Sequence, residues 1–302
     1  MRALLIGAVE STRIAADAIS CSPGWTLASI ATLPPHLAHR HSDFVDLAGP
    51  AASANATLLF TPNINSDDFL ASIQEIAPDI TFVIGWSQLC GSSFRAAARQ
   101  RVLGYHPAPL PRLRGRGVIP WTILLDEKIT ASTLFWIDEG TDSGPILAQR
   151  YMHVAPDETA SSLYARHMTA LRDLLTETLP RLLADDCPGE RQDELFATWA
   201  ARRRPDDGRI DWTRSAAEVE RLVRAVGRPY PGAFVGDGDR RVTIWSAQRQ
   251  EIGGTHHAMP GQVIARTDDS FLVRCGDGAA VRVLDFVAPG GKPPGLHSIV
   301  GV

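Results

Sequence analysis

The sequence predicts an α/β fold with a doubly wound, mostly parallel sheet, followed by a smaller domain of short β-strands. Continuous apolar runs at residues 3–9 and 80–85 are typical of strands that are buried on both faces of a parallel sheet. Segments with helical periodicity alternate with such runs as far as residue 183. Beyond residue 207, short alternating segments are separated by Gly- and Asp-rich turns, a pattern that favours a small β-barrel.

The elements of the first part follow from the same patterns. Ser11 or Thr12 is expected near the N-cap of the first helix, and Ser66 is expected to cap the second, where acidic residues follow. Residues 33–50 are polar and contain prolines, so we expect a loop there. The expected elements between the two apolar runs are a helix at 11–20, strands at 25–32 and 57–60, and a helix at 66–76.

The second half of the chain contains a shift in composition that marks the expected domain boundary. Between residues 185 and 206, Pro188 and Gly189 precede a run of charged residues. We therefore expect a first domain at 1–188, a linker at 189–206 and a second domain at 207–302. The expected elements of this half are helices at 118–127, 159–183 and 216–226 and a strand at 130–137.

Composition argues against several classes of protein. A formal net charge of −4 over 302 residues gives no electrostatic support for a nucleic-acid partner. No apolar run reaches about 18 residues, and Glu10 interrupts the short run at the N-terminus, so we expect neither a membrane span nor a signal peptide. The cysteines are widely spaced and are expected to be buried thiols of a cytoplasmic protein: Cys21, Cys90, Cys187 and Cys275.

Two loops carry the groups best suited to catalysis. Prolines after His106 fix the backbone, so this histidine is presented on a stiff loop just beyond a strand. The run DEGTDSG at 138–144 brings carboxylates to the end of another strand. A histidine on one loop and an aspartate on the next are the minimum for an acid–base pair. If the strands are parallel, these loops and residues 85–89 gather at one edge of the sheet.

Two kinds of cofactor are not expected. The turn after Gly7 lacks the G-x-G-x-x-G pattern of dinucleotide-binding proteins, which argues against a nicotinamide cofactor. The loop histidines His36, His39 and His41 could in principle ligate a metal, but carboxylate or cysteine companions in a metal-site pattern are not evident. We expect these histidines to be solvated and expect no metal.

The runs HPAPLPRLRGRGVIPW and DEGTDSGPILAQ resemble the core of the 10-formyltetrahydrofolate-dependent formyltransferases. That family includes methionyl-tRNA formyltransferase, the amino-sugar formyltransferases and the hydroxyornithine formyltransferases. Residues 207–248 resemble the start of the family's C-terminal domain, so the resemblance covers nearly the whole chain. It implies a Rossmann-like first domain, an OB-like second domain and 10-formyltetrahydrofolate as co-substrate.

The resemblance also implies roles for residues at the strand ends. His106 would polarise the formyl oxygen or move a proton, and Asp142 would orient His106 and favour its imidazolium form. Asp138 and Glu139 would either contact folate or only shape their turn, in which Gly140 and Gly144 are expected to take positive φ. The implied cofactor-binding residues are Trp86, Ser87, Gln88, Leu89, Pro109, Leu110, Pro111, Arg116, Asp138, Glu139, Gly140 and Thr141. For Trp86, plain packing stays an equal alternative.

Gly104 departs from the family pattern, which usually has asparagine two residues before the histidine. That amide donates to the developing oxyanion, and losing one such donor costs about 10²–10³ in rate. Three explanations stay open: another donor replaces it, the glycine makes room for a bulkier acceptor, or the domain only binds its ligands. The Gly-x-His form resembles relatives with otherwise intact motifs, which favours the first two. Candidate donors are Tyr105, Ser87, Gln88, Trp86 and backbone N–H groups.

We therefore expect formyl transfer to an amine or hydroxylamine nitrogen of a small molecule, such as a nucleotide-linked amino sugar or N-hydroxyornithine. The SDFVDL run within 33–50 resembles a small-molecule branch, and this loop has one arginine and no lysine where the tRNA enzyme carries a basic insertion. The alternatives are methionyl-tRNA formyltransferase, a folate or nucleotide-sugar binding module, and hydrolysis of the donor. A monomer and a homodimer are both compatible with the sequence.

Overall fold

The computed structural model describes residues 1–41, 43–186, 188–252 and 256–302. The chain divides into two compact units, which we describe separately. The first comprises Met1–Val118, Ile129–His153 and Tyr164–Ala201, and the second comprises Ile119–Lys128, Val154–Leu163 and Arg202–Val302. The domain limits expected from the sequence stay predictions.

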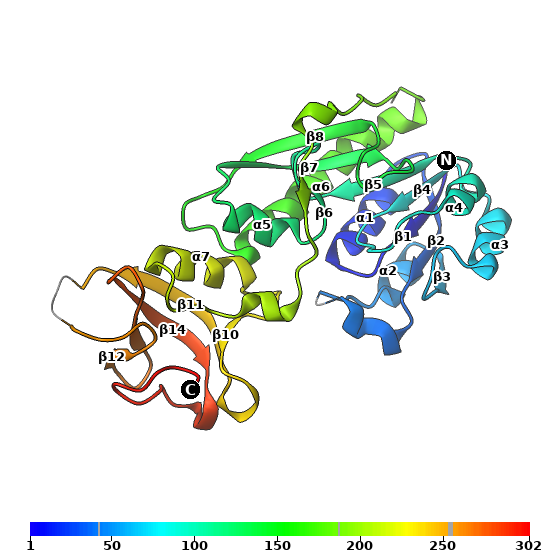
Figure 1. Ribbon diagram of the computed structural model, residues 1–302. Helices are drawn as coiled ribbons and strands as arrows, with labels where there is room; N and C mark the ends of the chain where they lie inside the picture. The colour runs from blue at the N-terminus through cyan, green and yellow to red at the C-terminus, as the bar shows by residue number, and fades with distance from the viewer. Residues whose placement is uncertain (42, 187, 253–255) are drawn as a thin grey trace. The chain divides into compact units, whose positions relative to one another are not determined.

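A seven-stranded sheet forms the centre of the first unit, with the order β3-β2-β1-β4-β5-β7-β8 (Figure 1). The first five strands in this order are parallel, whereas β7 runs antiparallel to β5 and β8 runs antiparallel to β7. The expected mostly parallel α/β sheet is therefore confirmed. The strands are β1 Arg2–Ile6, β2 Thr26–Thr32, β3 Thr57–Phe60, β4 Ile80–Val83, β5 Val102–His106, β7 Ile129–Trp136 and β8 Ile146–His153.

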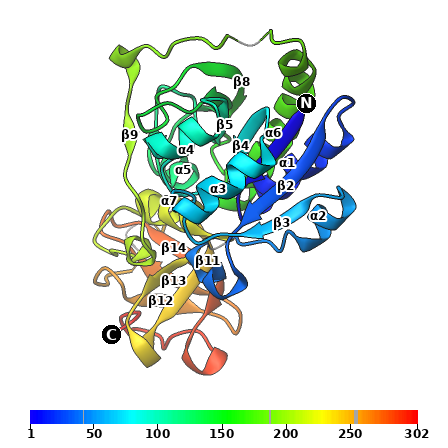
Figure 2. The ribbon, with the colours of Figure 1, turned by 90° about the vertical axis from the view of Figure 1, so that its right-hand side faces the viewer.

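Apolar side chains on both faces of this sheet explain the continuous runs in the sequence. On one face, Leu5 and Phe82 pack with α1 (Glu10–Cys21) and α6 (Ala160–Leu183). On the other face, Leu4, Ile6 and Val83 pack with α3 (Asp67–Ile76) and α4 (Ser92–Ala97), which lie in front of the sheet in Figure 2. Successive strand residues point to opposite faces, so burial of both faces requires an unbroken apolar run.

The structure confirms the positions of the expected helix starts and corrects their details. The N-cap of α1 is Val9, and Thr12 lies in the first turn, where its hydroxyl accepts a hydrogen bond from Val9 N–H and donates one to the Ile84 carbonyl. Ser66 is the N-cap of α3, but its hydroxyl donates to the Asn63 carbonyl rather than capping the helix. The expected loop at 33–50 contains a 3-10 helix, Pro35–Arg40, and the start of α2, Ala48–Ser53.

Other differences follow from local geometry. Helix α5 spans Val118–Leu124 and ends before Glu127, because Asp126 takes a φ of 56° that cannot continue a helix. Cys21 is exposed at the end of α1, whereas Cys90 and Cys275 are buried, and all three are free thiols. Cys187 lies outside the described residues. Two short strands, β6 (Arg114–Gly115) and β9 (Trp199–Ala200), pair in parallel in the first unit.

The second unit contains a five-stranded antiparallel sheet with the order β10-β11-β14-β13-β12. Helix α7 (Ala216–Val226) packs on β11 and β14, and Ser215 caps it by accepting a hydrogen bond from Glu218 N–H. This confirms the expected small β-domain. Its strands are β10 Ala233–Val235, β11 Val242–Gln250, β12 Val263–Arg266, β13 Phe271–Arg274 and β14 Ala280–Val287.

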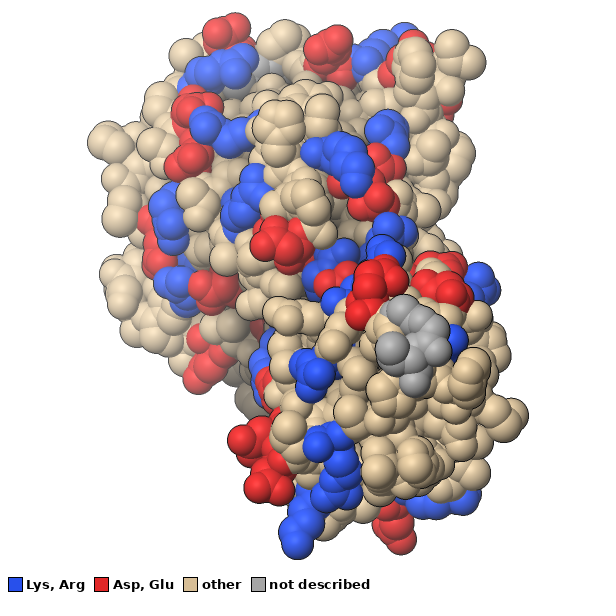
Figure 3. Space-filling view, turned by 90° about the vertical axis from the view of Figure 1, so that its left-hand side faces the viewer, with Lys and Arg blue, Asp and Glu red and all other residues tan. Residues whose placement is uncertain are grey.

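Short 3-10 helices follow α6 along the chain. The 3-10 helices of the later part are Glu194–Phe196 in the first unit and Pro205–Gly208, Gly238–Arg240 and Pro289–Gly291 in the second. Lys and Arg side chains alternate with Asp and Glu over the face drawn in Figure 3. In the described segments no helix combines the length and apolar character needed to cross a membrane.

Candidate active site

His106 is the last residue of β5, and its side chain is only 7% exposed. Its Nε2 lies 2.7 Å from the Leu113 carbonyl oxygen. A carbonyl oxygen can only accept, so Nε2 carries the proton in this contact. In a neutral imidazole, Nδ1 is then left with the lone pair. The loop therefore fixes which nitrogen of His106 can take up a proton.

Asp142 lies beside that nitrogen. Its Oδ2 is 3.7 Å from Nδ1 of His106, and the same oxygen accepts a hydrogen bond of 2.8 Å from the Gly115 N–H. At this distance the carboxylate faces Nδ1 without a direct hydrogen bond, which needs a separation of about 3.2 Å or less. The structure thus brings together the two residues that the sequence assigns to catalysis: His106, which ends β5 instead of following it as expected, and Asp142, which lies in the loop after β7.

The loop that carries Asp142 is closed by its own side chains. The Asp138 carboxylate accepts hydrogen bonds from the Gly140 N–H at 3.0 Å and from the Ser143 hydroxyl at 2.8 Å, so this side chain shapes the turn. The expectation of positive φ at Gly140 and Gly144 is wrong, because neither is among the residues with positive φ. Glycine is needed there for space: a Cβ on Gly140 would collide with the Ser143 hydroxyl, and one on Gly144 with the Trp136 carbonyl.

A cavity of about 90 Å³ lies where the end of β4, β5 and the loop after β7 meet. Gly104 and Asp142 are part of its wall. Of the predicted cofactor-binding residues, the wall includes Trp86, Gln88, Leu89, Asp138, Glu139 and Gly140. Three separate stretches of sequence therefore converge on one small cavity beside the His106–Asp142 pair.

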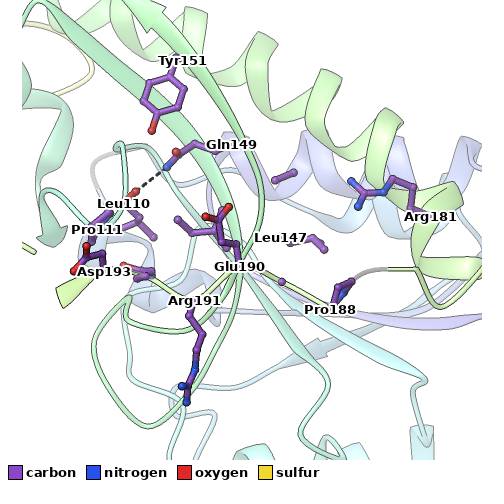
Figure 4. A pocket seen from close by; sticks show the side chains of 14 residues that line it. Leu110, Pro111, Leu147, Gln149, Tyr151, Arg181, Pro188, Glu190, Arg191 and Asp193 are labelled. Atoms are coloured by element: carbon purple, nitrogen blue, oxygen red, sulfur yellow. Dashed lines mark hydrogen bonds between the residues drawn. The ribbon is translucent and has the colours of Figure 1, made fainter. Parts of the chain in front are cut away.

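Other predicted cofactor-binding residues lie elsewhere. Leu110 and Pro111 line a larger, open hollow of about 690 Å³ along β8 and residues 188–193 (Figure 4). Within it, Gln149 donates from Nε2 to the Leu110 carbonyl at 3.0 Å, which ties the proline loop to the edge strand. Pro109 and Thr141 line neither the small cavity nor this hollow.

Ser87 and Arg116 instead belong to a polar group that we call the His41 cluster: His41, Asp43, Ser87, Arg116 and Tyr164. The Ser87 hydroxyl lies 3.2 Å from His41 Nε2, and the Tyr164 hydroxyl donates to the Asp43 carboxylate at 2.8 Å. Burial lowers the pKa of His41; Asp43 opposes this shift, while Arg116 and Arg40 add to it. The His41 cluster thus joins the expected loop at 33–50 to the loop after β4.

Sequence reasoning did not anticipate this use of His41. The expectation that the loop histidines are solvated holds for His36 and His39, which are exposed. It does not hold for His41, which is half-buried, contacts the Ser87 hydroxyl and lies near Asp43 and Arg116. Within the described residues, no group of three or more His, Cys, Asp or Glu side chains is placed to hold a metal ion. The SDFVDL run was the signal that could have pointed to Asp43; Ser42 of that run lies outside the described residues.

The candidates to replace the missing asparagine amide differ in the hydrogen bonds that they already make. The Tyr105 hydroxyl is 2.9 Å from the Ser132 hydroxyl and points to the face of the sheet opposite Gly104 and His106. Gln88 uses both ends of its amide, accepting from Ile64 N–H and donating to the Pro62 carbonyl. Trp86 Nε1 is buried and has no hydrogen-bond partner among the described residues.

Comparison with known families identifies the chain. Residues 27–179 match the family described as formyl transferase, and residues 203–300 match the formyl transferase C-terminal domain. The chain belongs to the formyl transferase family. The matched segments include His106, Asp142 and the cavity beside them. This formyl transferase is therefore an enzyme of the group-transfer class that the family resemblance implies.

Solved structures support the same fold at low sequence identity. An N-formyltransferase from Helicobacter canadensis, in complex with folinic acid and dTDP-3-aminofucose, is 15% identical with a TM-score of 0.69; the match covers 93% of this chain and 98% of that one. HypX from Aquifex aeolicus in complex with tetrahydrofolic acid is 20% identical with a TM-score of 0.64, over 93% of this chain and 43% of that one. A likely sugar N-formyltransferase from Mycobacterium tuberculosis is 18% identical with a TM-score of 0.63; the match covers 81% of this chain and 95% of that one. This formyl transferase thus spans less than half the length of HypX.

Proposed function

We propose that this formyl transferase moves the formyl group of 10-formyltetrahydrofolate to an amine nitrogen of a small molecule. The observation that carries the proposal is the placement of His106 Nδ1 beside the carboxylate of Asp142, a residue that lines the small cavity. A base next to a carboxylate is what amine formylation requires, because the attacking nitrogen must lose a proton.

The proposed reaction uses these two residues in sequence. The acceptor nitrogen attacks the formyl carbon, and His106 Nδ1 takes the proton that this nitrogen loses. Asp142 stabilises the imidazolium while the negative charge develops on the formyl oxygen. The bond between the formyl carbon and N10 of the folate then breaks, and N10 takes the proton from the imidazolium. The products are a formamide and tetrahydrofolate, with His106 neutral again.

The charge on the formyl oxygen requires a donor in place of the family asparagine. Among the candidate side chains, Trp86 has an N–H without a hydrogen-bond partner in the described residues, and Trp86 and Gly104 line the same cavity. Backbone N–H groups stay the alternative. Tyr105, Ser87 and Gln88 already make hydrogen bonds to other protein groups. We therefore assign the donor role to the Trp86 indole, which at this position combines a flat surface for a ligand ring with one N–H.

The small cavity is proposed to hold part of the folate. The solved relatives from Helicobacter canadensis and Aquifex aeolicus contain folinic acid and tetrahydrofolic acid, which supports a folate as donor. A volume of about 90 Å³ is below the roughly 300 Å³ of a small-molecule pocket, so side chains must move on binding. Leu89 is 68% exposed at the rim and is the side chain that we expect to move.

The His41 cluster is proposed to bind the acceptor. It supplies a carboxylate from Asp43 and hydroxyls from Ser87 and Tyr164, groups that can bind an ammonium and the hydroxyls of a sugar. The Helicobacter canadensis relative contains dTDP-3-aminofucose, which supports an amino sugar linked to a nucleotide as the first acceptor to test. N-Hydroxyornithine is the second.

The test follows release of tetrahydrofolate from 10-formyltetrahydrofolate with a panel of amines and with initiator methionyl-tRNA. Wild type is compared with His106→Asn, expected to lose about 10²–10⁴ in kcat, and with His153→Ala, an exposed histidine at the end of β8, as control. Release that depends on a small amine and on His106 supports the proposal. Release only with tRNA, release without any acceptor, or folate binding with no release would each overturn it.

A further inference from the structure

A segment near the end of the first unit makes hydrogen bonds with the loop after His106 and with the Asp142 loop. We call residues 190–200 the strap. In the first unit it follows α6 and leads to β9, along the path visible in Figure 2. Glu190 exchanges two backbone hydrogen bonds of 2.7 Å with Ile146, just beyond the Asp142 loop. At its other end, the Thr198 carbonyl accepts from Arg114 N–H and the Thr198 hydroxyl accepts from Leu113 N–H.

Gln192 is the residue of the strap that contacts both loops with its side chain. Its Nε2 donates to the carbonyls of Asp142 and Gly144, each at 2.8 Å. Its Oε1 accepts from Nε and Nη2 of Arg114, at 3.1 and 2.8 Å. A guanidinium can only donate and a carbonyl can only accept, so the amide has one permitted orientation. Both hydrogen bonds that Nε2 donates therefore go to carbonyls of the Asp142 loop.

Arg114 makes this arrangement rigid. Its side chain is 3% exposed, and besides Gln192 it donates to both carboxylate oxygens of Glu194, at 2.7 and 2.9 Å. The hydrogen bond from Arg114 lowers the pKa of Glu194, so this carboxylate stays charged. The guanidinium also lies 5.8 Å from the centre of the Trp199 ring. A buried cation with a carboxylate, an amide and an aromatic ring around it has little freedom to move.

The main chain of Asp142 needs such support. Its φ of 52° lies in the left-handed region, which is costly for a residue with a side chain. Gln192 holds its carbonyl, while Gly115 N–H holds its carboxylate 3.7 Å from His106 Nδ1. We propose that Gln192 is a positioning residue for the acid–base pair: it fixes the backbone of Asp142, and thereby the carboxylate that faces His106. This inference rests on the proposed function.

Two variants of Gln192 separate positioning from simple packing. Gln192→Met keeps the length of the side chain and removes its hydrogen bonds. Gln192→Glu keeps an acceptor for Arg114 but turns a carboxylate oxygen toward two carbonyls. We expect both to lower kcat by about 10-fold to 10²-fold, since small displacements of a catalytic group have effects of this size. Arg191→Met, the exposed neighbour in the strap, is the matched control and is expected to retain wild-type kcat.

A double-variant comparison shows whether Gln192 acts through Asp142. Asp142→Asn removes the charge that Gln192 is proposed to position, so Asp142→Asn with Gln192→Met should be no slower than Asp142→Asn alone. Equal fractional losses of kcat from Gln192→Met in both backgrounds would overturn the inference, as would an unchanged kcat in Gln192→Met. If Gln192→Met does not fold, Gln192→Asn, one methylene shorter, allows the same comparison.

A readout that does not need turnover keeps this inference separate from the proposed function. The ¹⁵N resonances of the His106 imidazole can be compared by NMR at one fixed pH in wild type, Asp142→Asn and Gln192→Met. If Gln192 positions Asp142, both variants shift these resonances in the same direction from wild type, because the ring loses the carboxylate beside Nδ1. A Gln192→Met spectrum equal to that of wild type overturns the inference even if the enzyme is active. Wild type without any acceptor-dependent release overturns the proposed function alone.

Discussion

The phenyl ring of Phe135 occupies the space that a side chain on Gly104 would need. A Cβ atom on Gly104 would lie 2.9 Å from Cε1 and Cζ of Phe135 and 3.0 Å from Cγ1 of Ile137. The two residues are cross-strand partners on β5 and β7, and Phe135 is buried. The glycine therefore does not simply lack the asparagine of the family, because the neighbouring strand has filled the place of that side chain.

Gly104→Asn is consequently expected to lower the stability of the protein and not to raise its kcat. The asparagine would overpack against Phe135 and lower the free energy of unfolding by about 1–3 kcal/mol. Adding Phe135→Leu should recover part of that stability, because the ring is removed. Urea unfolding of the two variants and of Phe135→Leu alone measures this. An asparagine variant as stable as wild type, with a higher kcat, would contradict the prediction.

Trp86→Phe removes one N–H while keeping an aromatic ring in the cavity wall. If this N–H stabilises the formyl oxygen, kcat falls by about 10²–10³ while the KM for the folate changes much less. Trp245→Phe in the second unit is a matched control, since its buried Nε1 also has no hydrogen-bond partner in the described parts of the chain. Steady-state kinetics decide the question, and an equal kcat for wild type and Trp86→Phe would refute the assignment.

Asp43→Asn tests the His41 cluster as the acceptor site. The carboxylate would bind an ammonium or sugar hydroxyls, and a hydrogen bond to a charged group contributes about 1.5–3 kcal/mol. We expect the KM for the acceptor to rise at least about tenfold while the KM for the donor is unchanged. Asp46→Asn, nearby on the same loop and exposed, is the control. A rise in the KM for the folate instead would place the donor at this cluster.

His167 predicts a pH dependence of stability. Burial lowers its pKa to about 3, with smaller contributions from His106 and Arg166, and its Nδ1 lies 2.9 Å from the Ser132 hydroxyl. The unfolded chain takes up the proton near its ordinary pKa of about 6.5, so the stability from neutral His167 is complete above that pH. It is lost as the pH falls from 6.5 toward 3. Urea unfolding of His167→Asn should show a shallower loss over this range, and parallel curves would exclude the effect.

Local patterns in the sequence account for much of the fold and for the selection of His106 and Asp142 as the candidate catalytic pair. The buried runs of β1 and β4 and the proline loop after His106 are continuous stretches, so they can be recognised without knowing the rest of the structure. The direction of β7 could not be recognised in this way. A strand buried on both faces has the same apolar pattern whether it runs parallel or antiparallel to its neighbour.

The parts of the site that the sequence did not predict depend on contacts between distant residues. Gln192 lies in a polar stretch expected to be a linker, and such a composition does not distinguish a solvated segment from one bound to backbone carbonyls. Its contact with Asp142 spans 50 positions. The family resemblance implies a folate contact for Leu110 and Pro111, which stays a prediction; the structure places both in the wall of the hollow along β8.

The strap also has a consequence for the order in which this protein is made. Gln192, Glu194 and Thr198 leave the ribosome after His106, Asp142 and all seven strands of the first sheet. Until then the guanidinium of Arg114 and the carbonyl of Asp142 lack the partners that hold them. A fragment that stops at residue 179, where the first family match ends, would contain His106 and Asp142 without Gln192, Glu194 and Thr198. A fragment meant to carry out formyl transfer should extend at least through Ala201, the last residue of the first unit.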